Sequence, residues 1–282
     1  MSITVYTSDP LIIKENITKP ISNVLLYLDD WTFLQENRSP GITIYVHLEP
    51  EAMTNARGFL CKNYERIDYI LTFDSVILAS CPNARKYIYG NTWILEEDWK
   101  HVDIHAKQYK ITSFITSKSR TKGHHFRKEL YMNQLSISQI PLIFYRGSSV
   151  KDTLQEIGNN PLLYSKRSSK IELFKDAEFS LVIENSREHN YFTEKLCDCL
   201  ITKTIPIYYG APNISDYFDT TGWIILTSES ITELSEKLAI LTPEYYMNNL
   251  NTCLKNYEIV QKYINLTDNI NKGLKQFPCF YY

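Results

Sequence analysis

Residues 179–210 read FSLVIENSREHNYFTEKLCDCLITKTIPIYYG and contain the clearest succession of secondary-structure signals in the chain. Phe179–Ile183 and Ile205–Tyr209 are short runs rich in β-branched and aromatic residues, which is typical of buried strands. Between them, Thr193 stands at the position of a helix cap, in front of a segment that runs to Ile201. A strand, a helix and a second strand in this order predict part of a parallel α/β sheet.

The alternation extends in both directions from this stretch. Around it the sequence predicts strands over Ile111–Thr116, Leu142–Tyr145 and Trp223–Leu226, and helices over His125–Leu135, Lys170–Asp176, Ile231–Leu241 and Pro243–Ile264. The first third of the chain predicts strands over Ile3–Thr7, Val24–Leu28, Ile42–Leu48, Tyr69–Phe73 and Tyr87–Tyr89. The polar segment Glu96–His105 reads as the connection between two halves.

We therefore expect two domains, residues 1–108 and residues 109–282. The long helix from Pro243 has two open placements, packing back on the first domain or forming a dimer contact, because periodicity does not choose between them. The oligomeric state is not predicted.

Composition narrows the class of protein. The chain has 282 residues, of which 44% are hydrophobic and 22% charged, and its net charge is −2. These values are ordinary for a globular protein and exclude a disordered chain, a fibrous repeat and a coiled coil. A generic nucleic-acid binder is usually strongly basic, so we expect no nucleic-acid partner. No apolar run approaches the ~18 residues of a membrane span, and the start lacks the pattern of a signal peptide, which predicts a cytoplasmic protein.

The carboxyl ends of the predicted parallel strands are where a ligand is expected, close to helix N-termini. The loop after Ile111–Thr116 carries Lys118, Lys122 and Arg127 and no acidic residue, which favours phosphate binding. A solvated basic face is the open alternative. Arg127 is the strongest candidate, because its planar guanidinium suits a pyrophosphate and it lies in the first turns of a helix.

Glu194 and Lys195 fall in the first turn of the helix that follows Phe179–Ile183. A lysine at this end opposes the helix dipole, which makes sense if an anion binds there; a surface Glu–Lys pair is the alternative. In the first half, Glu49 follows a strand end, where a carboxylate is suited to act as a general base; a surface acid is the alternative. The sequence contains no G-x-G-x-x-G, P-loop or H-E-x-x-H motif and no Asp-x-Asp pair, so we expect no metal site.

Three segments in order, FSLVIENS (179–186), YFTEKLCDCL (191–200) and TIPIYYGAP (204–212), make the sequence specific. They resemble the signature of the α-1,3/4-fucosyltransferases, glycosyltransferase family 10, in a form like its soluble bacterial or viral members. The resemblance spans about residues 40–230 and is looser outside the last fifty of them, where SFITS (113–117), GHHFR (123–127) and HLEP (47–50) take part. One departure is Ile183, where the family usually has an aromatic residue.

The resemblance implies a GT-B-like α/β architecture of two Rossmann-like domains facing a cleft, and an inverting transfer of L-fucose from GDP-fucose to a glycan hydroxyl. It implies that Arg127 and Lys195 hold the diphosphate and Glu194 the ribose. Asn185 and Tyr191 would line the nucleotide-sugar pocket, and Glu49 would be the general base. Lys118 and Lys122 are further phosphate-binding candidates. The expected partners are a nucleotide sugar and a glycan acceptor, no cofactor is required, and the expected setting is the cytoplasm of a bacterium or a virus-infected host cell.

Two alternatives stay open at this point. The same scaffold would suit another nucleotide-sugar donor, because the Glu194–Lys195 pair addresses ribose and diphosphate and not the sugar. The second alternative is a non-catalytic protein that binds a nucleotide or a glycan. Such a protein has no physical need for Arg127, Glu194, Lys195 and Glu49 together.

Overall fold

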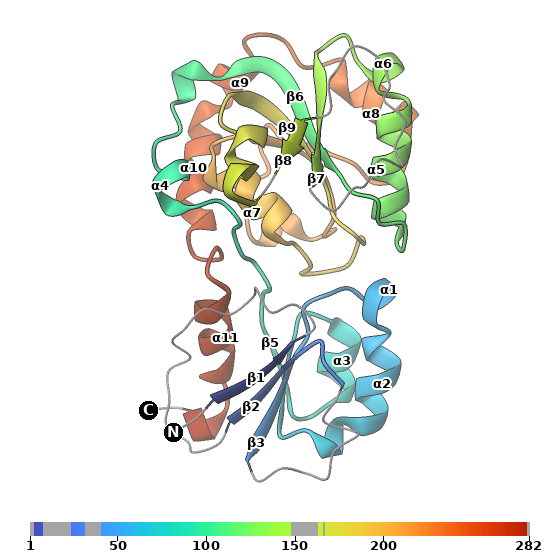
Figure 1. Cartoon of the computed structure of the whole chain (residues 1–282), viewed down its shortest axis with the longest axis vertical. Coiled ribbons are helices and arrows are strands. Elements are labelled where there is room, and N and C mark those ends of the chain that lie inside the picture. Colours follow the sequence, from blue (N-terminus) through green and yellow to red (C-terminus); the bar gives the residue numbers. More distant parts are fainter. Residues whose placement is uncertain (1–2, 8–23, 32–40, 148–162, 166, 281–282) are drawn as a thin grey trace. The chain divides into compact units, whose positions relative to one another are not determined.

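The computed structural model describes residues 3–7, 24–31, 41–147, 163–165 and 167–280, which fall into two compact units (Figure 1). The first unit takes residues 1–90, 188–191 and 265–282, and the second takes residues 91–187 and 192–264. The chain thus leaves the first unit at Gly90, earlier than the boundary expected after residue 108. The reason is local, because Thr92 Oγ1 and the Trp93 backbone N–H donate to Asp198 of the second unit at 2.6 and 2.9 Å.

The first unit is built on a five-stranded parallel sheet in the order β1-β2-β3-β4-β5. Its strands are β1 (Ile3–Thr7), β2 (Val24–Leu28), β3 (Ile42–Val46), β4 (Tyr69–Thr72) and β5 (Ala84–Lys86). The first four lie where the sequence predicts them. The fifth prediction is wrong, because Tyr87 and Tyr89 follow β5 and pack into the core instead of extending the sheet.

Helices cover both faces of this sheet (Figure 1). One face carries α2 (Ala56–Asn63) and α3 (Ser75–Ser80), whose Leu60 and Ile77 pack in a cluster with strand residues such as Tyr45. The other face carries α11 (Leu266–Leu274), and a Cβ added to its Gly273 would lie 2.8 Å from Leu71 of β4. Burial on both faces explains why the strands read as continuous apolar runs. The short helix α1 (Glu51–Thr54) follows β3.

The second unit contains a six-stranded parallel sheet in the order β11-β10-β9-β6-β7-β8. The strands are β6 (Gln108–Ile115), β7 (Leu142–Gly147), β8 (Leu163–Ser165), β9 (Ala177–Ile183), β10 (Ile205–Tyr209) and β11 (Ile224–Ile225). Its helices are α4 (Glu96–Trp99), α5 (Lys122–Met132), α6 (Gln134–Ile137), α7 (Glu194–Ile201), α8 (Ile231–Leu238), α9 (Tyr245–Asn248) and α10 (Leu250–Val260). Short 3-10 turns lie at Tyr64–Arg66, Ile104–Ala106, Arg167–Leu173, Ile214–Asp216 and Pro278–Phe280.

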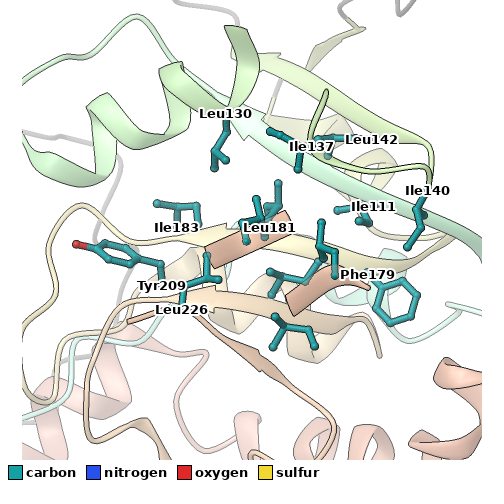
Figure 2. Close-up of a cluster of buried hydrophobic side chains, with 14 of the residues drawn as sticks. Ile111, Leu130, Ile137, Ile140, Leu142, Phe179, Leu181, Ile183, Tyr209 and Leu226 are labelled. Atoms are coloured by element: carbon teal, nitrogen blue, oxygen red, sulfur yellow. The ribbon is translucent and has the colours of Figure 1, made fainter. Parts of the chain in front are cut away.

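The core of the second unit packs its helices against the sheet. Leu130 of α5 and Ile137 of α6 point toward Leu181 and Ile183 of β9, as Figure 2 shows. All seven residues of β9 are buried, so the polar side chains that follow Ile183 are placed by a rigid strand.

Three predicted helices differ from the structure. The single helix over Pro243–Ile264 is wrong: α9 ends at the Asn248–Asn249 pair, α10 ends at Val260, and α11 begins a new helix in the first unit. Asparagine favours helix ends because its amide competes for backbone hydrogen bonds. Helix α5 starts at Lys122 and not at His125, because Thr121 Oγ1 caps it by accepting the His124 N–H. The helix expected over Lys170–Asp176 is the 3-10 turn Arg167–Leu173. Across the described ranges, the helices are too short or too polar to cross a bilayer.

Candidate active site

The loop from β9 to α7 forms the centre of the candidate site in the second unit. Thr193 caps α7 as predicted, with its Oγ1 accepting the backbone N–H of Lys195 at 3.3 Å. The Thr193 N–H and hydroxyl donate to the two carboxylate oxygens of Glu184, both at 2.8 Å. Glu184 is fully buried, and this burial raises the pKa of its carboxyl although Lys195 lowers it. The start of α7 is therefore tied to the end of β9.

Lys195 and Glu194 lie together at the N-terminus of α7. The Lys195 ammonium is 3.1 Å from Glu194 Oε1, 3.6 Å from Glu184 Oε2 and 3.0 Å from Thr193 Oγ1. Burial by itself would raise the pKa of Glu194, but Lys195 and Lys170 outweigh it and lower that pKa to about 2. Glu194 thus stays ionised at neutral pH, next to a lysine whose side chain is 22% exposed and accessible to a ligand.

Arg127 lies on α5 against the end of β9 and is 5% exposed. Its Nη2 donates to Asn185 Oδ1 at 3.0 Å, and its Nη1 donates to the Ile183 carbonyl. The structure therefore brings together Arg127 and Asn185, two of the predicted donor-binding residues. Two of the guanidinium donors are occupied by the protein itself, which fixes the direction of the side chain.

Gly123 lets the first turn of α5 approach β9 closely. Its N–H donates to the Asn185 carbonyl at 3.1 Å, and a Cβ placed on it would lie 1.8 Å from the Glu184 carbonyl oxygen. Only a glycine fits this approach. The N-termini of α5 and α7 consequently meet the same strand end, and both direct the positive ends of their helix dipoles there.

His124 is a buried residue of this edge that the sequence analysis missed. Its Nδ1 lies 2.7 Å from Thr121 Oγ1. Burial, and after it the positive charges of Arg127, Lys195 and Lys118, together lower the pKa of His124 to about 3. The imidazole is therefore neutral at physiological pH. The spacing Thr121-x-x-His124, typical of a helix cap and its third helical residue, was the sequence signal that could have placed His124 in the first turn of α5.

Lys118 and Lys122, the further phosphate candidates, are both exposed. The Lys122 side chain is 81% exposed, and its Nζ is 4.0 Å from Glu229 Oε1, whose carboxylate accepts the Tyr209 hydroxyl. Neither lysine joins the buried group around Arg127 and Glu184, so their phosphate contacts stay a prediction.

Glu49 and Tyr191 come together in the first unit. Glu49 follows β3, and its Oε2 accepts the Tyr191 hydroxyl at 3.3 Å. Tyr191 is buried with its ring 5.1 Å from that of Phe73, and the preceding Asn190 donates to the Phe73 carbonyl at 3.1 Å. Glu188 accepts from Arg57 at 3.2 Å. Residues 188–191 therefore leave the second unit and anchor on the first, so Tyr191 contacts Glu49, while its role toward a nucleotide sugar stays a prediction.

Within the ranges that the structure describes, no three His, Cys, Asp or Glu side chains are arranged to hold a metal ion. His47, beside Glu49 in the sequence, is fully buried with its Nδ1 2.9 Å from Thr72 Oγ1 and its ring stacked on Phe73. Burial lowers the pKa of His47 to about 4, so it is a neutral packing residue.

The fold is similar to solved glycosyltransferases of the GT-B type. It matches the crystal structure of an α1,3-fucosyltransferase with GDP-fucose at 16% identity and a TM-score of 0.51, over 89% of this chain and 79% of that one. It matches TarM at 15% identity and a TM-score of 0.60, over 90% and 54%. A trehalose-phosphate synthase from Burkholderia xenovorans matches at 12% identity and a TM-score of 0.60, over 89% and 72%. These likenesses confirm the expected fold of two Rossmann-like α/β units.

The sequence comparisons define the family. Residues 104–267, more than half of the chain, match the family described as glycosyltransferase family 10 (fucosyltransferase) C-term. A stretch of 78 residues is 33% identical to an α-(1,3)-fucosyltransferase of Helicobacter pylori, and one of 74 residues is 31% identical to a putative fucosyltransferase-like protein of Arabidopsis thaliana. The matched stretches cover 28% and 26% of this chain and 14% of each relative. The chain belongs to glycosyltransferase family 10, as its motifs predict.

Proposed function

We propose that this protein is an inverting glycosyltransferase that moves L-fucose from GDP-fucose to a hydroxyl of a glycan. The observation that carries the proposal is the group at the carboxyl end of β9. There Lys195, within 3.6 Å of two carboxylates, starts α7, and Arg127 is locked against Asn185 on the same strand end. Family membership and the naming of GDP-fucose in a similar structure support the choice of donor.

The charge pattern suits a nucleoside diphosphate. A lysine at a helix N-terminus is electrostatically unfavourable by a few tenths of a kcal/mol, and a bound diphosphate offsets this cost because its negative charge attracts both the ammonium and the helix end. The N-terminus of α5 adds a second positive end at the same place. Glu194, ionised because its pKa is about 2, accepts hydrogen bonds from ribose hydroxyls.

The reaction is a single in-line displacement. The acceptor oxygen forms a bond to the anomeric carbon of fucose while the bond from that carbon to the diphosphate oxygen breaks, and GDP leaves with the electron pair. The acceptor proton goes to the carboxylate of Glu49, a step worth about 10²–10⁴ in rate. Lys195 and Arg127 stabilise the charge that grows on the leaving diphosphate, so they act more strongly on the transition state than on the bound donor.

The test is the binding of nucleotides by calorimetry. GDP and GDP-fucose should bind more tightly than UDP, CDP, ADP and dTDP and their sugars. Lys195→Ala should raise the Kd for GDP at least tenfold, whereas Lys237→Ala, which removes a lysine paired with Glu233 at 2.8 Å on α8, should leave it within twofold. Preference for UDP or dTDP compounds would refute GDP-fucose as the donor. Absence of binding by a folded sample would refute the transferase proposal.

A further inference from the structure

The carboxylate of Asp29 accepts hydrogen bonds from the backbone of Glu49 and of the residue before it. Asp29 directly follows β2, and its Oδ2 accepts the Glu49 N–H at 2.6 Å. Its Oδ1 accepts the Leu48 N–H at 3.1 Å and the Tyr45 hydroxyl at 2.9 Å. Three donors from β3 and the residues after it therefore converge on one side chain.

These bonds begin where the sheet ends. The parallel register of β2 and β3 pairs Leu28 with Val46, and the Asp29 N–H donates to the Val46 carbonyl at 3.1 Å as the last bond between the strands. Beyond that point the N–H groups of Leu48 and Glu49 have no strand to pair with, and an unpaired buried N–H is costly. The Asp29 carboxylate continues the pairing for two more residues and so fixes the exit direction of the chain after β3.

The backbone of Asp29 is held in an uncommon conformation that aims its side chain. Its φ is 47°, in the left-handed region, which costs a non-glycine residue about 1–2 kcal/mol. Aspartate tolerates this region better than most residues. The three hydrogen bonds to the Asp29 carboxylate offset this cost and keep the backbone in the left-handed conformation.

We propose that Asp29 is the positioning residue for the general base: through the backbone of Leu48 and Glu49, it sets the place from which the Glu49 carboxylate takes the acceptor proton. The inference rests on the proposed function, because it presupposes that Glu49 is the base. The carboxylate of Glu49 is held independently of Asp29, because its Oε2 accepts the Tyr191 hydroxyl.

The ionised form of Asp29 is the one that accepts all three donors, since a protonated carboxyl gives up part of its acceptor capacity. Burial, and to a smaller extent the Glu49 charge, raise the pKa of Asp29 to about 7 against the opposing effect of the Glu49 and Leu48 N–H groups and the Tyr45 hydroxyl. The Tyr87 hydroxyl also faces this carboxylate, and its own pKa is raised by burial and by the charge of Asp29. Turnover should therefore fall as the pH drops through about 7.

The test compares Asp29→Asn with a control variant of another aspartate, whose carboxylate binds the backbone at the opposite end of β3. The control is Asp68→Asn, because Asp68 Oδ2 likewise accepts a backbone N–H of β3, that of Thr43 at 2.8 Å. In the Asp29 variant an NH₂ group replaces one acceptor oxygen, so either the Glu49 N–H or the donors to Oδ1 lose their partner. Asp29→Gly is the second variant, because glycine adopts a positive φ without strain and removes the carboxylate entirely.

Two readouts decide the result. Amide hydrogen exchange of Leu48 and Glu49, followed by NMR, should be at least tenfold faster in the Asp29 variants and unchanged in Asp68→Asn. With GDP-fucose as donor, kcat should fall at least tenfold in the Asp29 variants while the Kd for GDP stays within twofold, and the fall of kcat through pH 7 should disappear. Adding Glu49→Gln to Asp29→Asn should cause no further loss beyond Glu49→Gln alone.

Equal effects of Asp29→Asn and Asp68→Asn on kcat, or unchanged exchange at Leu48 and Glu49, would overturn the inference. A normal kcat in Asp29→Asn with a large loss in Glu49→Gln would also overturn it and leave the base intact. A normal kcat in Glu49→Gln would instead refute the proposed base, so the two failures are distinguishable.

Discussion

Gly123→Ala is the substitution whose effect follows most directly from the geometry of the site. A Cβ at this position would lie 1.8 Å from the Glu184 carbonyl oxygen and 2.9 Å from its carbonyl carbon. Both atoms belong to the backbone that ends β9, so they cannot rotate away. Reaching an ordinary contact distance requires the first turn of α5 to move by roughly 1.5 Å.

Two opposing effects set the magnitude. Alanine is a better helix former than glycine by about 1 kcal/mol, which favours the variant. Overpacking against a rigid neighbour costs about 1–3 kcal/mol, and loss of the bond from the Gly123 N–H to the Asn185 carbonyl costs about 1 kcal/mol more. The overlap here is deep and against main chain, so the cost is at the upper end, and we expect a net destabilisation of about 2–3 kcal/mol. A displacement of this size would also move the N-terminus of α5 away from the proposed donor site, so we expect weaker GDP binding, and lower turnover as well because a misplacement of about 1 Å costs roughly 10² in rate.

The assay is thermal unfolding of both the variant and a control, together with the Kd for GDP. The control is Gly58→Ala in α2, where the nearest atom to the added Cβ is Asn55 Oδ1 at 3.6 Å. This variant should be as stable as the wild type or more stable, and should bind GDP normally. A Gly123→Ala protein with wild-type stability and GDP affinity would refute the close approach of α5 to β9 and its place in the donor site.

Three further predictions concern the chemistry of the site. The pKa of Glu194 is about 2, below its ordinary value of 4.5, so its carboxylate stabilises the folded state by about 3 kcal/mol above pH 4.5, and this stabilisation is lost as the pH falls toward 2. Glu194→Gln should flatten that part of the curve of stability against pH, and parallel curves for variant and wild type would contradict the assignment. Glu49→Gln should keep GDP binding and lower turnover at least a hundredfold, and near-normal turnover would exclude it as the base. Turnover should survive EDTA, because Lys195 and Arg127 supply positive charge to the diphosphate; a loss restored by a divalent metal would show the opposite.

Most of the strands were predictable because burial on both faces produces continuous apolar runs, whereas the three-residue strands β5 and β8 were not predicted. β1, β2 and β10 have the predicted bounds, and β9 begins two residues before its predicted start. The helices of the first unit were not found, since α2 has only eight residues and α3 only six, and helices this short depend on the sheet for their stability. The split of the predicted C-terminal helix is a tertiary effect, because α11 packs on β4 of the first unit.

The candidate site was predictable in its residue types and not in its contacts. The order of strand, polar loop and helix placed Asn185, Glu194 and Lys195 correctly at one strand end. Nothing local to the sequence indicated that residues 188–191 anchor on the first unit and bring Tyr191 to Glu49, because such contacts join segments 142 positions apart. Asp29 was missed for the same reason, since its partners come from the neighbouring strand.

The most direct measurement is the NMR spectrum of GDP-β-L-fucose, labelled with ¹³C at the anomeric carbon, during incubation with the protein. Water or a glycan serves as the acceptor, so the acceptor need not be known. An inverting fucosyltransferase should release GDP with the first-formed product in the α configuration, and Glu49→Gln should lose this release. A first-formed β product, or faster turnover of a UDP-sugar than of GDP-fucose, would contradict the proposed function.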